Sequence, residues 1–165
     1  MNPERCRGCG SVFPYINGPV HAYIDSSAGC WAAYGDVLAR EYSNPEYMKV
    51  HRLTVDAYAI QHPGTASRRS TQSVAVHLIA LHLVLELGRT TQQATQAIRR
   101  AVESSAFSWL EPPKSRGTLT IATVLPAASA EQHTNLVSAW ARDAWAAWSN
   151  HHDQVRQWAA VTQAS

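Results

Sequence analysis

The sequence has 165 residues, of which 45% are hydrophobic and 16% are charged. This length and composition exclude intrinsic disorder and are typical of one ordinary domain that buries its own core. The net charge is only +2 and the basic residues are scattered, which excludes the positive cluster expected of a nucleic-acid-binding protein. The odd number of cysteines, three, favours metal or thiol chemistry over a disulfide framework.

The N-terminal segment, M-N-P-E-R-C-R-G-C-G, lacks the apolar region of a secretory signal, and we therefore expect a cytoplasmic protein. Residues 1–27 are rich in Gly, Pro and Tyr and show no helical periodicity. We predict loops in this segment, with one short extended piece near residues 21–24.

Helix-capping residues mark the next two elements. Two serines before Ala28 supply cap hydroxyls for a helix over about residues 28–42. An Asn-Pro pair at residues 44–45 starts a second helix. We expect this helix to end at His62, because the following proline disfavours helical geometry in the residue before it and a glycine comes next.

The stretch from Ser70 to Gly88 is the most apolar part of the chain, interrupted in its middle only by His77, His82 and Glu86. A helix that is hydrophobic on all sides is covered by other helices, so a central core helix is predicted. Its apolar run is shorter than the ~18 uninterrupted residues of a membrane span, so no membrane contact is expected.

The rest of the chain predicts more helices. A polar helix runs from Thr90 or Thr91 to about Ser104, and residues 118–125 form either a strand or a short helix. Residues 130–161 form one long helix, or two that meet near Asn150. Its apolar stripe consists of Val137, Trp140, Ala144, Trp148, His151, Val155 and Trp158.

This tryptophan-rich stripe has two alternative partners. It packs against the central helix, or against a second subunit, and its size leads us to expect a homodimer. The whole pattern predicts an all-α fold, a bundle of about five helices with an irregular N-terminal zinc-knuckle arm. We expect a single domain over residues 1–165, with the arm at 1–27 and the bundle at 28–165.

The motif C-R-G-C-G places Cys6 and Cys9 at the spacing of a zinc knuckle, with glycines that allow the tight turn between two thiolate ligands. Cys30 is the predicted third ligand. It lies in the first turn of a capped helix, where free N–H groups favour a thiolate. We expect Arg5 and Arg7 to offset the negative charge of such a site.

The fourth zinc ligand has two candidates. His21 lies in the same arm as the cysteine pair, and we prefer it because local ligands cost less loop-closure entropy. His62 is the alternative. In an antiparallel pair of helices, the end of the second helix lies level with Cys30 at the start of the first.

A second cluster is predicted between the second and the central helix. If the two are antiparallel with equal rise, His77 lies beside Asp56 and His82 lies beside His51. An Asp–His pair in a buried bundle can act as a general base. The alternative is a purely structural hydrogen bond, with Asp56 paired instead to Arg52 one turn away.

Several blocks of the chain resemble the bacterial domain-of-unknown-function family numbered 5946. They are C-R-G-C-G, G-P-V-H-A-Y, G-C-W-A-A-Y-G-D-V-L-A-R-E-Y, V-H-R-L-T-V-D-A-Y-A-I-Q-H-P-G, Q-S-V-A-V-H-L-I-A-L-H-L-V-L-E and W-L-E-P-P. The resemblance runs from Cys6 to about Trp158. It implies a small free-standing bacterial protein and brings no activity, ligand or catalytic residue with it.

Three functions are consistent with these patterns. The first is a zinc-binding helical protein whose metal is structural. The second is a metal- or histidine-dependent enzyme with a site around His62, His77 and Asp56. The third is a protein-interaction module that presents the tryptophan-rich C-terminal helix. The sequence predicts no particular substrate or small-molecule ligand.

Overall fold

The computed structural model describes residues 2–104 and 106–163. Within them, helices dominate and the sheet is a single two-stranded hairpin, so the predicted all-α bundle with an N-terminal arm is confirmed. The helices are α1 (Ala28–Ser43), α2 (Pro45–Met48), α3 (His51–Gln61), α4 (Arg68–Leu81), α5 (Thr91–Ser104), α6 (Ile121–Val124), α7 (Ala130–Ala147) and α8 (His152–Gln163). A π-helical turn, η1 (His82–Glu86), continues α4, and a 3-10 turn, η2 (Ser149–His151), joins α7 to α8.

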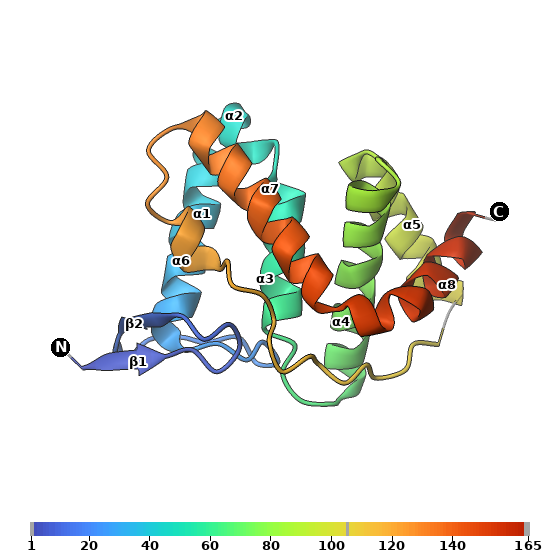
Figure 1. Ribbon diagram of the computed structural model, residues 1–165, viewed down its shortest axis with the longest axis horizontal. Helices are drawn as coiled ribbons and strands as arrows, with labels where there is room; N and C mark the ends of the chain where they lie inside the picture. Colours follow the sequence, from blue (N-terminus) through green and yellow to red (C-terminus); the bar gives the residue numbers. More distant parts are fainter. Residues whose placement is uncertain (1, 105, 164–165) are drawn as a thin grey trace.

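The helices form two groups that meet along α3 and α4 (Figure 1). In one group, α3 packs against α7, and α1 packs against α2 and α6. In the other, α4 packs against α5 and α8. The two ends of the chain lie at opposite ends of the molecule (Figure 1).

The central helix, α4, is surrounded by protein as predicted. Leu78, Ile79, Ala80 and Leu81, four consecutive residues, are all fully buried. The Ser67 side chain caps the helix by accepting a hydrogen bond from the N–H of Ser70. The π-helical turn η1 was not predicted.

Most other helix boundaries follow the predicted caps. Ser27 caps α1 by accepting the N–H of Cys30. The predicted helix that starts at the Asn-Pro pair is in fact two helices, α2 and α3, which break at residues 49–50. Residues 118–125 contain the short helix α6, with Thr120 in a capping box at its start. The C-terminal region is two helices, with the join at η2 close to Asn150.

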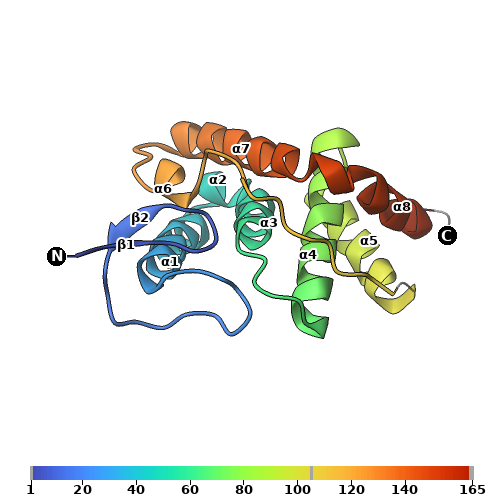
Figure 2. The same cartoon turned by 60° about the horizontal axis from the view of Figure 1, so that its bottom comes forward.

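The N-terminal arm differs from its prediction. The strands β1 (Pro3–Arg5) and β2 (Val12–Pro14) pair antiparallel, with Glu4 opposite Phe13. The expected extended piece near residues 21–24 is not a strand. The hairpin lies against the start of α1 (Figure 2), where a side chain at Gly29 would come within 2.8 Å of the Phe13 side chain.

The tryptophan stripe of α7 and α8 is buried within the chain. Trp140, Trp145, Trp148 and Trp158 are each at most 8% exposed. Indole N–H groups bond inward, Trp140 to the Gln61 side chain and Trp148 to the backbone carbonyl of residue 60. The stripe therefore packs against its own bundle, and it offers no exposed apolar face to a second subunit or another partner.

Among the described residues, no helix is both long enough and apolar enough to cross a membrane.

Candidate metal centre

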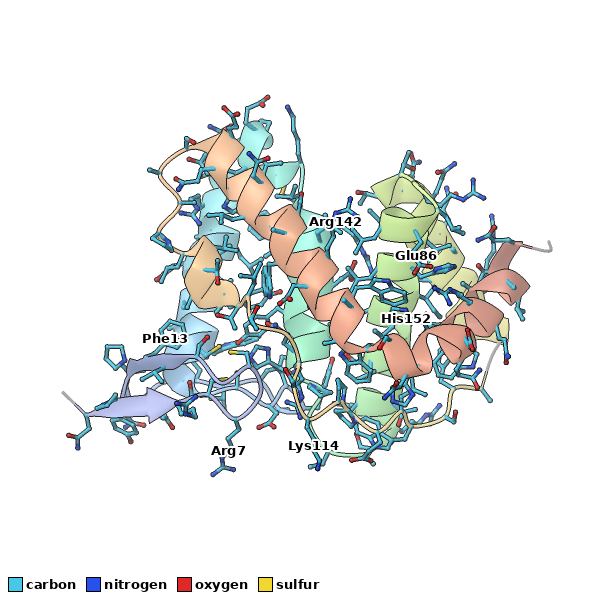
Figure 3. The ribbon with its side chains drawn as sticks, in the orientation of Figure 1. Arg7, Phe13, Glu86, Lys114, Arg142 and His152 are labelled. Atoms are coloured by element: carbon cyan, nitrogen blue, oxygen red, sulfur yellow. The ribbon has the colours of Figure 1, made fainter. Side chains whose placement is uncertain are left out.

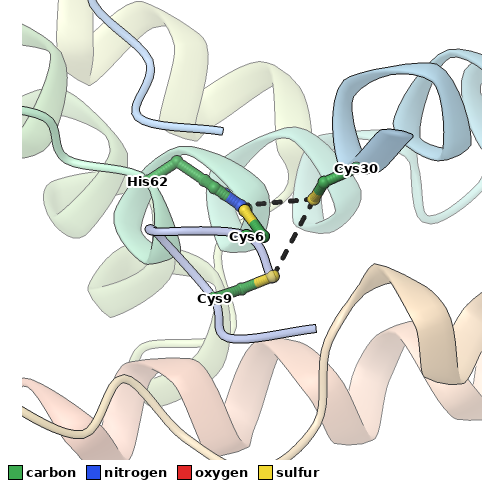
Figure 4. Close-up of side chains that lie close together, drawn as sticks. All are labelled: Cys6, Cys9, Cys30 and His62. Carbon is green, nitrogen blue, oxygen red and sulfur yellow. Dashed lines mark hydrogen bonds between the residues drawn. The ribbon is translucent and has the colours of Figure 1, made fainter. Parts of the chain in front are cut away.

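Four side chains converge where the hairpin, α1 and the end of α3 meet. They are Cys6, Cys9, Cys30 and His62, and their ligand atoms all lie within 4.8 Å of one another (Figure 4). The Cys30 sulfur lies 3.8 Å from that of Cys9 and 3.5 Å from Nε2 of His62. This group can hold a metal ion.

The tip of the β1–β2 hairpin supplies the first two thiols. The Cys6 N–H donates to the carbonyl of Ser11, which continues the strand pairing, and the Gly10 N–H donates back to the Cys6 carbonyl. Gly10 has φ +79°, a conformation that favours glycine. The hydrogen bond from Gly10 to Cys6 thereby closes the turn that carries both cysteines.

Gly8 lets this tip approach α3. A Cβ atom there would lie 2.3 Å from Cδ2 of His62 and 2.4 Å from the Asp25 carbonyl oxygen. The backbone of the knuckle consequently lies directly on the imidazole ring. Any larger residue would push the two thiols away from the other two ligands.

Cys30 comes from the first turn of α1 and is fully buried. Its sulfur lies 3.4 Å from the Tyr58 hydroxyl. Burial raises the pKa of Tyr58, so the phenol keeps its proton and can donate it to the sulfur. The ring of Tyr58 also stacks on that of His62, with 4.0 Å between centroids.

His62 follows the last residue of α3 and is fully buried. Its Nδ1 lies 2.7 Å from the backbone carbonyl of Tyr58. A carbonyl can only accept, so Nδ1 carries a proton and Nε2 is the ring nitrogen that faces the thiols, where a metal ion would take the place of its proton. A backbone carbonyl on the far nitrogen is the usual way in which a metal-binding histidine is oriented.

The charges of this group are coupled. Hydrogen bonds with Cys30 and Cys9 lower the pKa of Cys6, and hydrogen bonding with Cys6 raises that of Cys30. Burial acts to lower the pKa of His62, but hydrogen bonds and charges from Cys6 and Cys9 outweigh it and raise the pKa to about 9. The group therefore concentrates negative charge on the Cys6 thiol.

Arg116 is a cation beside this negative charge that no pattern in the sequence indicated. Its guanidinium donates to the Gly8 carbonyl at 2.9 Å. Burial lowers its pKa from the ordinary 12.5, and the nearby charges of Asp25 and Cys6 oppose that change. The predicted role of Arg7 is not seen, because its side chain is exposed and points away from the site (Figure 3).

The structure brings His62, and not His21, to the three cysteines. Nδ1 of His21 instead accepts the N–H of Tyr23, and its ring packs on Tyr23 and Trp31. The preferred candidate, His21, therefore lies outside the cysteine group, whereas the alternative candidate, His62, lies within it.

The predicted Asp–His pair is formed. Nδ1 of His77 lies 2.7 Å from Oδ1 of Asp56, as the antiparallel register of α3 and α4 predicts. Asp56 is fully buried and also accepts from Arg52 at 2.9 Å, so the two alternatives for this carboxylate occur together. His82 and His51 do not pair: they bond to Glu86 and Glu41.

The three candidate catalytic residues do not share a site. His77 is 19% exposed and lines a surface cleft, whereas His62 is fully buried and belongs to the cysteine group. A single centre formed by His62, His77 and Asp56 is therefore not present.

The fold and the site together define a helical protein with a buried Cys3His group that can hold a metal ion. A family model described as a family of unknown function, DUF5946, matches residues 4–149. The chain belongs to this family, as its sequence blocks indicated. No curated protein and no solved structure matches the chain.

Proposed function

We propose that this protein is a zinc-binding helical protein in which the metal is structural and fastens the N-terminal arm to the bundle. The observation that carries the proposal is the buried group of three thiols and one imidazole. Soft thiolate ligands with one imidazole favour zinc over the hard cations that prefer oxygen.

Two distances in this group match the edges of a zinc tetrahedron. Zn–S bonds of about 2.3 Å and a Zn–N bond of about 2.05 Å give tetrahedral edges of about 3.8 Å between sulfurs and about 3.6 Å between sulfur and nitrogen. Two of the three edges at Cys30, 3.8 Å to Cys9 and 3.5 Å to His62, agree with these values.

Four protein ligands support a structural role. A catalytic zinc keeps one position open for water or substrate, whereas a closed set of four holds parts of the chain together. Three thiolates, a neutral imidazole and Zn²⁺ leave one net negative charge, and the Arg116 guanidinium beside Gly8 is placed to offset it.

We predict one zinc per chain after expression with ample zinc, measured by elemental analysis of the purified protein. Replacing His62 with Gln removes a ligand, so His62→Gln protein should lose its zinc to a chelator that leaves the unaltered protein loaded. Cys30→Ser should behave in the same way. The cobalt-substituted protein should show sulfur-to-metal charge-transfer absorption.

His21→Gln is the matched control, because it changes the rival histidine by the same substitution. It should keep one zinc and the unaltered cobalt spectrum. The proposal is wrong if the native chain carries no metal and its three thiols titrate freely. Loss of zinc from His21→Gln but not from His62→Gln would refute the assigned fourth ligand.

A further inference from the structure

A cleft of about 470 Å³ lies beside the first turns of α4, away from the cysteine group. One wall is Tyr23, from the loop that precedes α1 and extends toward the start of α4 (Figure 2). The other wall is one face of α4, formed by Arg68, Arg69, Gln72, Ser73, Val76 and His77.

The charge of this cleft is positive. Arg68 and Arg69 are exposed, and within the part of the chain that the structure describes neither guanidinium has a hydrogen bond or an ion pair. No carboxylate is among the described residues that line the cleft. Two unpaired guanidiniums on one wall are suited to a carboxylate or phosphate group.

His77 stands at the inner end of this wall. Its Nδ1–H donates to the buried carboxylate of Asp56, which Arg52 holds from the other side. Among the described residues, Nε2 has no hydrogen-bond partner, and the side chain is 19% exposed. The Asp56 bond fixes the ring, so Nε2 is presented to whatever occupies the cleft.

A smaller cavity of about 150 Å³ adjoins the cleft, since both are lined by Tyr23, Ser73 and His77. Its other walls include the rings of Trp31, Tyr34 and Tyr58. The lining mixes aromatic and polar side chains, and the volume is about that of a cavity that holds one benzene ring.

We propose that the cleft and its adjoining cavity form a binding site for a small organic anion with one planar ring. Arg68 and Arg69 bind the carboxylate or phosphate, His77 bonds to the ligand through Nε2, and the aromatic cavity takes the ring. This site shares no proposed metal ligand with the Cys3His group, and it stands whether or not that group holds zinc.

The test is titration of the full-length protein with three probes of equal ring size: benzoate, phenyl phosphate and benzyl alcohol. We expect calorimetry to show binding of at least one of the two anions and at least about tenfold weaker binding of the uncharged alcohol. Tighter binding of phenyl phosphate or of benzoate identifies the acidic group. In the imidazole NMR spectrum, the His77 signal, assigned by its loss in His77→Gln, should shift on binding.

Charge-matched variants separate a built site from general attraction. Arg68→Ala with Arg69→Ala should weaken anion binding by about tenfold or more. Arg99→Ala with Arg142→Ala removes the same charge from exposed positions outside the cleft, on α5 and α7, and should leave binding unchanged. Figure 3 labels Arg142 on α7.

Three outcomes would overturn the proposal. They are no binding of either anion at millimolar concentration, equal losses in the two arginine double variants, and binding that leaves the His77 signal in place. The comparison of the two arginine double variants does not use His77→Gln, so it gives an answer even if that variant fails to fold.

Discussion

Glu41 is a fully buried carboxylate surrounded by hydrogen-bond donors. It accepts from Thr54, from Nδ1 of His51 at 2.8 Å and from Nε2 of His133 at 3.0 Å. His133 is also fully buried, and within the described residues its Nδ1 has no partner. His133 is therefore neutral, because a second proton would place an N–H in the core with nothing to accept it.

This arrangement predicts that acid destabilises the fold through His133. Burial lowers the pKa of His133 below its ordinary 6.5, against the opposing effect of the Glu41 hydrogen bond. Below about pH 6.5 the unfolded chain then binds a proton that the folded chain does not, so the free energy of unfolding falls as the pH falls. Denaturant unfolding from pH 7.5 to 5 measures this slope.

His133→Gln is the comparison, since the amide can still donate to Glu41 but does not titrate. It should cost about 1–2 kcal/mol at pH 7.5 and show a flatter dependence on pH. An identical slope in the variant would mean that His133 does not set the acid sensitivity.

At the level of single side chains, the three cysteines of the group were predictable and its fourth member, His62, was not. The C-R-G-C-G spacing and the cap before Cys30 point to three thiols. His21 was preferred over His62 on loop-closure entropy, but that cost rises by only about 0.6 kcal/mol for each doubling of loop length. The packing of α1 beside α3 outweighs so small a term, and Gly8 closes the contact by letting the knuckle lie on the His62 ring.

At the level of elements, predictions succeeded where a capping or helix-breaking residue marks the start or the end of a helix. The starts of α1, α4 and α7 each have a serine cap. The hairpin was missed because strands of three residues are too short to show alternation. The break at residues 49–50 contains no proline or glycine to mark it. The π-helical turn η1 begins at His82. The prediction that His82 lies beside His51 assumed two regular helices and was therefore wrong.

If the Cys3His group holds a metal as proposed, the hairpin should depend on it more than any helix does. Outside the Cys3His group its ties to the bundle are few, and they include the Ser11–Thr120 hydroxyl bond of 2.6 Å and the Arg116–Gly8 bond. Removing the metal with a chelator should raise amide hydrogen exchange in residues 2–27 by at least about tenfold, while the core of α4 stays protected.

Mass spectrometry of peptides from both regions measures this difference. The His21→Gln protein, which keeps all four proposed ligands, should respond to the chelator as the unaltered chain does. Equal exchange in the arm before and after metal removal would contradict a stapling role.

At the scale of the whole molecule, the burial of the tryptophans changes which surface could form a homodimer interface. The homodimer remains a prediction, but the stripe that suggested it is covered by α3, α4 and α5 of the same chain. Dimerisation would therefore have to proceed through another surface. Sedimentation at tens of micromolar tests it, and a monomer of 18.1 kDa would contradict it.

We predict that the four C-terminal tryptophans stay shielded whatever the oligomeric state. The test uses the variant Trp31→Phe with Trp109→Phe, in which the two half-buried tryptophans are replaced. When this protein is diluted, its tryptophan fluorescence should stay at short wavelength and resist quenching by acrylamide. A red shift on dilution would show that a subunit interface, and not the fold, covers the stripe.

All four candidate ligands lie within the first 62 residues, yet the helix that braces His62 comes much later in the chain. Trp148 of the α7–α8 join bonds to the carbonyl of Ile60, two residues before that histidine. At a synthesis rate of about 5–20 residues per second, Trp148 follows His62 out of the ribosome by about 4–17 s. The nascent chain thus has all four candidate ligands before this brace exists, so the proposed metal could be captured during translation and organise the first third of the protein ahead of the rest.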